Sequence, residues 1–108
     1  MPIYDFSRML GILIDNAIEA AASTNPKIVK MIFRNSTQSC TQIVKIENTY
    51  LNKTIDINKI FKKGISEKKN HSGIGLWEVS QILKRNNNIK LITNPNKKYF
   101  CQTLEIYY

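Results

Sequence analysis

The sequence predicts an α/β two-layer sandwich of the α+β type, with helices on one face of a mixed, mainly antiparallel sheet. Three observations lead to this prediction. Helical and strand patterns alternate in the order helix, two strands, basic loop, helix, two strands. The strands come in consecutive pairs joined by short polar stretches, which favours antiparallel hairpins. No strand–helix–strand repeat supports a doubly wound parallel sheet.

The 108 residues form one predicted domain, residues 1–108, and 43% of them are hydrophobic, enough for one core. No apolar run approaches the ~20 residues of a membrane span, and no secretory leader opens the chain. Cys40 and Cys101 lack metal-site spacing, which favours a reducing, cytoplasmic setting. Sixteen Lys+Arg against eight Asp+Glu give a charge of +8 and predict an anionic partner.

The first element is a predicted helix that starts at Asp5 as N-cap and ends before Pro26. On a helical wheel its edge carries Ile12, Asn16 and Glu19, where a helix meets both core and solvent. One apolar stripe is formed by Phe6, Met9, Leu10, Leu13, Ala17 and Ala20.

Apolar alternation predicts strands at 27–34 and 41–48, joined through the polar stretch 35–39. Asn48 continues the inward face of Val44 and Ile46, at a position where the strand alternation predicts an apolar residue.

The second half begins with a predicted helical turn at 54–61 and a polar, basic loop at 62–72. A second helix runs from about Ile74 to Arg85, and two closing strands cover 89–93 and 99–107, with Gln102 facing inward. The inward stripe of this helix is Leu76, Val79, Ile82 and Leu83.

The junction Ser72-Gly73-Ile74-Gly75-Leu76 is the first candidate for a ligand site. Glycines allow close backbone approach, and the free N–H groups of a helix's first turn favour an anion. Short glycine motifs are common, so the alternative is a flexible loop with an N-cap serine.

Two asparagines are further candidates. The amide oxygen of Asn16 suits Mg²⁺, although such a residue is more often a surface or capping group. Asn48 either bonds to a neighbouring loop or faces a bound ligand. His71 is the single histidine, so no constellation with a second histidine is available.

Two segments, LGILIDNAIEA at 10–20 and HSGIGL at 71–76, resemble the N box and G2 box of GHKL (Bergerat-fold) ATPases. More narrowly, the chain resembles the ATP-binding domain of sensor histidine kinases. It is most similar to the accessory-gene-regulator type, the peptide-pheromone (quorum-sensing) receptor kinases of Gram-positive bacteria. Further matching segments are IEN at 46–48, IFKKGISEK at 60–68 and FCQTLEI at 100–106.

The resemblance implies the Bergerat fold and a site for ATP and Mg²⁺. Asn16 would be the Mg²⁺ ligand, and Asn48 stands where most of the superfamily carries the Asp that binds the adenine amino group. Residues 62–72 would be the ATP lid, with Lys68 at a phosphate. The phosphates would also be bound by Ser72, Gly73, Ile74, Gly75 and Leu76.

Ile12 bears on the mechanism. ATP-hydrolysing members of the family carry a general-base Glu four residues before the Mg²⁺ asparagine, and this chain has Ile12 there. Isoleucine cannot activate water, whereas transfer to a histidine needs only positioning and charge neutralisation. The resemblance therefore implies a protein-histidine kinase domain, with no catalytic residue of its own beyond nucleotide positioning.

The resemblance also implies a larger protein around this domain. The accepting histidine would lie in an upstream dimerisation domain, and a response regulator would be the partner of a homodimeric, membrane-bound receptor with this domain in the cytoplasm. The isolated chain is expected to be monomeric and to have no nucleic-acid partner. Two alternatives stay open: a basic nucleic-acid-binding domain, and a degenerate GHKL-like partner-binding module.

Overall fold

The computed structural model describes residues 3–51, 75–96 and 98–108. The predicted helical turn at 54–61 and the basic loop at 62–72 lie outside these residues. The described elements are α1 (Ile3–Ala22), β1 (Val29–Ser36), β2 (Thr41–Asn48), α3 (Gly75–Arg85), β3 (Ile89–Pro95) and β4 (Phe100–Tyr107). Each strand boundary lies within two residues of its prediction.

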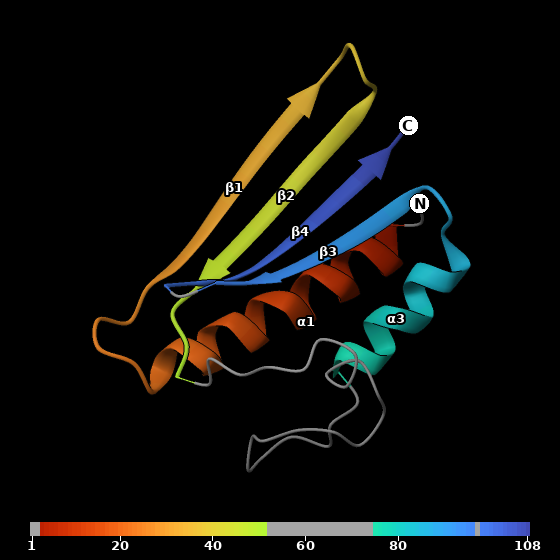
Figure 1. Ribbon diagram of the computed structural model, residues 1–108. Coiled ribbons are helices and arrows are strands. Elements are labelled where there is room, and N and C mark those ends of the chain that lie inside the picture. The colour runs from red at the N-terminus through yellow and green to blue at the C-terminus, as the bar shows by residue number, and fades with distance from the viewer. Residues whose placement is uncertain (1–2, 52–74, 97) are drawn as a thin grey trace.

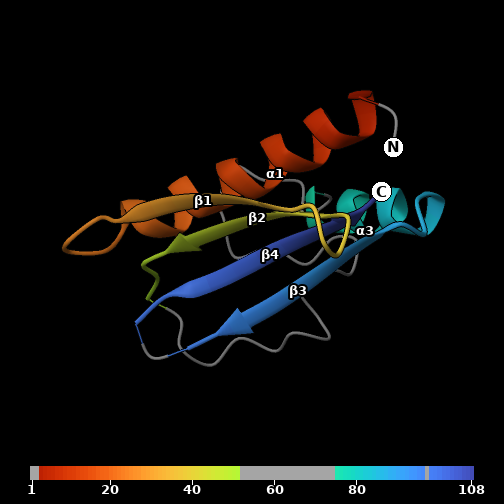
Figure 2. The same ribbon diagram turned by 90° about the horizontal axis from the view of Figure 1, so that it is seen from above.

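The sheet has the order β1-β2-β4-β3, and every pair is antiparallel. Both helices lie along the same face of this sheet (Figure 1), and in the view from above α1 runs alongside β1 (Figure 2). The predicted two-layer sandwich with helices on one face is confirmed. Neither described helix is both long and apolar enough to span a membrane.

The core lies between the two helices and the two central strands. Because strand side chains alternate between faces, Val44 and Ile46 of β2 and Leu104 of β4 point to the helices and are buried. Most of the predicted helical stripes pack there, but Ile12, predicted at the edge, is 7% exposed and belongs to the core. The residues buried most completely are Met9, Leu13, Val79, Ile82 and Leu104.

The N-cap prediction for Asp5 is wrong, because α1 already includes Ile3 and Asp5 lies in its first turn. The Asp5 carboxylate accepts hydrogen bonds from Arg85 Nη2 at 3.1 Å and from Asn86 Nδ2 at 3.0 Å. Asn86 Nδ2 also bonds to the carbonyl of Ile82 at 2.9 Å. Asp5 therefore ties the start of α1 to the end of α3.

A second ion pair joins the same helices. Arg8 of α1 donates to Glu78 of α3 through two nitrogens, with Nη2 3.0 Å from Oε1. Since the pairings run from Asp5 with Arg85 to Arg8 with Glu78, the two helices are antiparallel. The two pairs fix where the first residue of α3 lies along α1.

Acid should weaken this connection. Hydrogen bonds from Asn86 and Arg85 lower the pKa of Asp5, and those from Arg8 lower the pKa of Glu78. A carboxyl group with a lowered folded-state pKa binds fewer protons in the folded than in the unfolded chain, so its contribution is full near neutral pH. That contribution is lost progressively below about pH 5.

We expect Asp5→Asn to be less stable than the wild type at pH 7, and the difference to shrink on acidification. Urea unfolding at pH 7 and at about pH 3 measures it. Asp15→Asn is the control, because Asp15 is an exposed carboxylate on the same helix. An equal difference at both pH values would remove Asp5 as the acid-sensitive contact.

Candidate nucleotide site

Asn16 is a half-buried residue of α1. One turn earlier, Ile12 packs against the first residue of α3: a β-carbon on Gly75 would lie 3.3 Å from Cγ2 of Ile12. A glycine at this position allows the close approach of the two helices. Because residues four apart share a helix face, Asn16 lies toward the start of α3.

The start of α3 can hold an anion. Gly75 and Leu76 are its first two residues, and the N–H groups of a first helical turn have no partner within the helix. Predicted site residues Lys68, Ser72, Gly73 and Ile74 precede it and lie outside the described residues, as does His71. The described part thus brings Asn16 toward Gly75 and Leu76, the last two residues of the predicted phosphate segment.

Asn48 is the last residue of β2 and is 3% exposed, on the face toward the helices. Its Nδ2 donates a hydrogen bond of 3.0 Å to the carbonyl oxygen of Thr49. This bond orients the amide, so that Oδ1 is the acceptor that Asn48 can offer to a ligand. The bond to the adjacent backbone confirms the first sequence alternative. That Asn48 faces a bound ligand stays a prediction.

A hydroxyl pair fixes the end of β2 against the end of α1. Thr49 Oγ1 lies 2.7 Å from Thr24 Oγ1, which in turn donates to the carbonyl of Ala21 at 2.7 Å. The N–H of Ile28 also donates to Thr49 Oγ1, at 3.1 Å. The position of Asn48 relative to α1 is therefore set by groups that sequence patterns did not single out.

Aromatic residues adjoin Asn48. Tyr50 is 6% exposed, its hydroxyl donates to the carbonyl of Asn96 at 2.5 Å, and its ring centroid lies 5.7 Å from that of Phe100. Burial raises the pKa of Tyr50, so the hydroxyl stays a donor. Phe100 is the cross-strand neighbour of Asn48, which places an apolar ring beside its amide.

The other inward polar residue, Gln102, is bonded within the sheet, since Nε2 lies 3.3 Å from Oγ1 of Thr93. Among the described residues, no three His, Cys, Asp or Glu side chains gather into a metal site. A Mg²⁺ ion held by one amide oxygen, phosphate oxygens and water needs no such cluster. Cys40 is exposed, Cys101 is buried, and both thiols are free.

Comparison with protein families decides the classification. The family model described as "GHKL domain" matches residues 1–107. The chain belongs to the GHKL domain family. No curated protein sequence matches this GHKL domain.

Solved histidine kinase structures share its fold. The catalytic domain of histidine kinase ThkA superposes with a TM-score of 0.76 at 21% identity, covering 96% of this chain and 66% of that one. The mycobacterial sensor histidine kinase MprB gives 0.74 at 16% identity, with coverages of 98% and 72%. The Acinetobacter baumannii histidine kinase AdeS superposes with a TM-score of 0.68 at 20% identity, and the match covers 96% of this chain and 46% of that one. This GHKL domain thus spans slightly under two thirds of the ThkA chain and under half of the AdeS chain.

Proposed function

We propose that this GHKL domain binds Mg-ATP and positions its γ-phosphate for transfer to a histidine in a separate domain of a sensor histidine kinase. The observation that carries the proposal is the close packing of α1 on the first residue of α3, through Ile12 and Gly75. This packing places the edge of α1 that carries the Asn16 amide toward the first N–H groups of α3, which have no partner within the helix. A metal-bound phosphate requires both an oxygen ligand for the metal and N–H donors for its own oxygens.

Each residue has a proposed role. The amide oxygen of Asn16 would coordinate Mg²⁺, which supplies positive charge next to the phosphates. The N–H groups of Gly75 and Leu76 would bind phosphate oxygens, together with Lys68 and the segment 72–74. Asn48 would accept a hydrogen bond from the adenine amino group through Oδ1, against the rings of Tyr50 and Phe100.

Hydrolysis of ATP is not part of the proposal. Ile12 occupies the position at which a base would lie, and it is buried against Gly75, where its side chain excludes water instead of activating it. Phosphoryl transfer to a histidine relies on positioning and electrostatic stabilisation, which the remaining residues provide.

A calorimetric titration with ATP, in the presence of Mg²⁺ and then of a chelator, tests the proposal. We expect Mg²⁺-dependent binding, no transfer of label from γ-labelled ATP to the 108-residue chain, and phosphate release at background. Lack of ATP binding would overturn the proposal, and binding of an oligonucleotide instead would favour the nucleic-acid alternative. Label on His71 would contradict the assignment of residues 62–72 as the lid.

Base selectivity gives a second test. An ionised aspartate can only accept a hydrogen bond, so from side-chain chemistry alone Asn48→Asp would raise the preference for ATP over GTP. The structure changes this expectation, because a carboxylate would face the Thr49 carbonyl that now accepts the Asn48 amide. Because the bond to Thr49 leaves Oδ1 as the acceptor toward the base, we expect the wild type to prefer ATP over GTP by about tenfold or more. We expect Asn48→Asp to lose affinity for both nucleotides, because its carboxylate is repelled by the Thr49 carbonyl oxygen.

Competition binding of ATP against GTP measures the selectivity. Thr103→Ser is the control, because Thr103 lies on β4 on the face away from the helices. An unchanged ATP affinity in Asn48→Asp would show that Asn48 does not face the base.

We also propose the setting of the domain in a larger protein. The order of its motifs supports a peptide-pheromone receptor kinase, membrane-bound and homodimeric, with this domain in the cytoplasm. The accepting histidine would lie in a dimerisation domain upstream, and a response regulator would receive the phosphoryl group.

A further inference from the structure

The connection between β3 and β4, which we call the β3–β4 turn, is organised by one asparagine side chain. Oδ1 of Asn96 accepts hydrogen bonds from the backbone N–H groups of Lys98 at 3.0 Å and of Tyr99 at 2.8 Å. The N–H of Asn96 donates to the carbonyl of Tyr99 at 2.9 Å. An asparagine that bonds to the backbone two and three residues further on favours one conformation of a turn. Because Phe100 follows directly as the first residue of β4, this turn determines where β4 begins.

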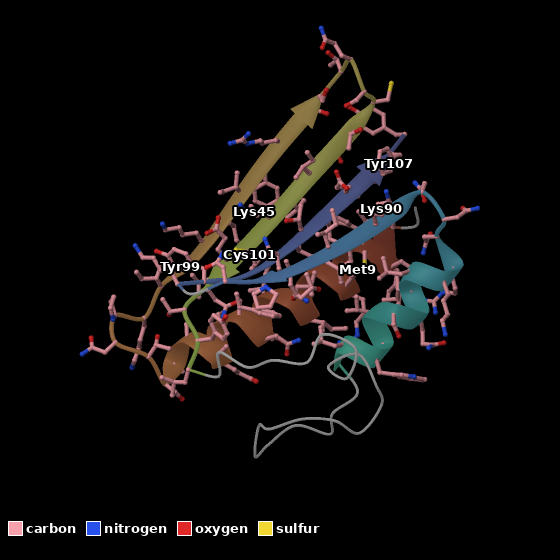
Figure 3. All side chains as sticks on the ribbon, viewed as in Figure 1. Met9, Lys45, Lys90, Tyr99, Cys101 and Tyr107 are labelled. Atoms are coloured by element: carbon pink, nitrogen blue, oxygen red, sulfur yellow. The ribbon has the colours of Figure 1, made fainter. Side chains whose placement is uncertain are left out.

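Tyr50 connects the β3–β4 turn to the end of β2. Its hydroxyl donates to the backbone carbonyl of Asn96 at 2.5 Å, and the whole residue is only 6% exposed. Figure 3 shows Tyr99 of this turn at the end of the sheet where β2 ends, and Tyr107 at the opposite end. A buried hydroxyl without an acceptor is costly, so the bond favours one position of the turn relative to β2.

The same tyrosine also contacts the residue opposite Asn48. Phe100 is the cross-strand neighbour of Asn48, and its ring centroid lies 5.7 Å from that of Tyr50, with the ring planes tilted by 57°. Tilted aromatic pairs at this separation attract each other. Tyr50 therefore positions Phe100 twice, through the turn that precedes it and through direct contact between the rings.

The two residues that follow Asn48 are bonded to different parts of the fold. Thr49 is bonded to Thr24, beyond the end of α1, and its carbonyl accepts the Asn48 amide. Tyr50 is bonded to Asn96 in the β3–β4 turn. The protein thus holds the Asn48 amide in one place and one orientation before any ligand binds. A group that is held in this way discriminates between ligands, because turning to suit a different one would break its existing bonds.

We propose that Tyr50 is a positioning residue that sets the base selectivity of the site. Its hydroxyl bond keeps the β3–β4 turn and Phe100 in place, so that the ring and the Asn48 amide are presented to the base in one arrangement. This role rests on the proposed function, since it concerns the base of the bound nucleotide. The proposed phosphate end, at Asn16 and Gly75, lies on the two helices and does not include the turn.

Tyr50→Phe tests this role, because it removes the hydroxyl and keeps the ring. Competition binding of ATP and GTP, with Mg²⁺ present, measures both affinities. We expect Tyr50→Phe to bind ATP about three- to tenfold more weakly than the wild type and GTP no more weakly, so that the ATP-to-GTP preference falls. A general disturbance of the site would weaken both nucleotides. Tyr107→Phe is the control, because Tyr107 is an exposed tyrosine at the other end of the sheet, and it should behave as the wild type.

Asn96→Ala loosens the same turn from its other side, since it removes the acceptor of the Lys98 and Tyr99 N–H groups and leaves Tyr50 intact. We expect it to lower the ATP-to-GTP preference as well. Because both substitutions act through one turn, the double variant Tyr50→Phe/Asn96→Ala should bind ATP about as weakly as the weaker single variant.

Three results would overturn the role of Tyr50 and leave the proposed function standing. These are an ATP-to-GTP ratio equal to that of the wild type in either single variant, equal losses for ATP and GTP, and losses that multiply in the double variant. Failure of the wild type itself to bind ATP would overturn both proposals.

Discussion

Replacement of Asn16 by alanine is expected to lower the affinity for Mg-ATP by about ten- to hundredfold. The substitution removes the amide oxygen proposed as the protein's ligand to Mg²⁺ and leaves the ion with phosphate and water oxygens. The effect should disappear in the presence of a chelator, because it acts through the metal. Calorimetry of wild type and Asn16→Ala, each with and without Mg²⁺, measures both affinities.

Asn87→Ala is the matched control, since Asn87 is an exposed asparagine beyond the end of α3. It should bind Mg-ATP as the wild type does. Because Asn16 is only half-buried, Asn16→Ala should keep the fold, which thermal unfolding verifies. Equal Mg-ATP affinity for Asn16→Ala and wild type would remove Asn16 from the site.

Met9→Ala is expected to cost about 2–5 kcal/mol of folding free energy. Met9 is 0% exposed and lies in the core cluster between α1 and the sheet. Truncation removes apolar contacts and leaves a cavity, because the ion pairs at Asp5 and Arg8 restrict the movement of α1. In a domain with a total stability of about 5–15 kcal/mol, this is a large fraction.

Urea unfolding measures the loss, with Ile18→Ala as the control on the same helix. Ile18 is 53% exposed, so its truncation should cost well under half as much. Equal losses for the two variants would show that Met9 does not lie at the centre of the core.

Local periodicity predicted the helices and strands of the described residues, apart from the start of α1. Alternation at Val44 and Ile46 predicted β2, and the spacing of Met9, Leu13 and Ala17 predicted the buried side of α1. These patterns succeed because neighbours along a helix or strand decide which face is apolar. The start of α1 was misplaced, since Asp5 suits an N-cap but is bonded to Arg85 and Asn86 at the end of α3.

The candidate site was predicted in part. Asn48 was recognised as a polar residue on an inward face, and the structure confirms its burial. The orientation of its amide depends on the Thr49 carbonyl, and the place of β2 depends on the Thr24–Thr49 pair. These contacts join residues that are not related by helix or strand periodicity, so no sequence pattern predicts them.

The sequence by itself determined the order of elements, the inward faces and the family, because these follow from local patterning and from motifs. Tertiary structure alone decided how the elements meet. It placed Gly75 against Ile12, and it packed Ile89 of β3 into the core with α3. The alternation in β3 shows which residues share a face, but whether that face is covered depends on where distant helices pack.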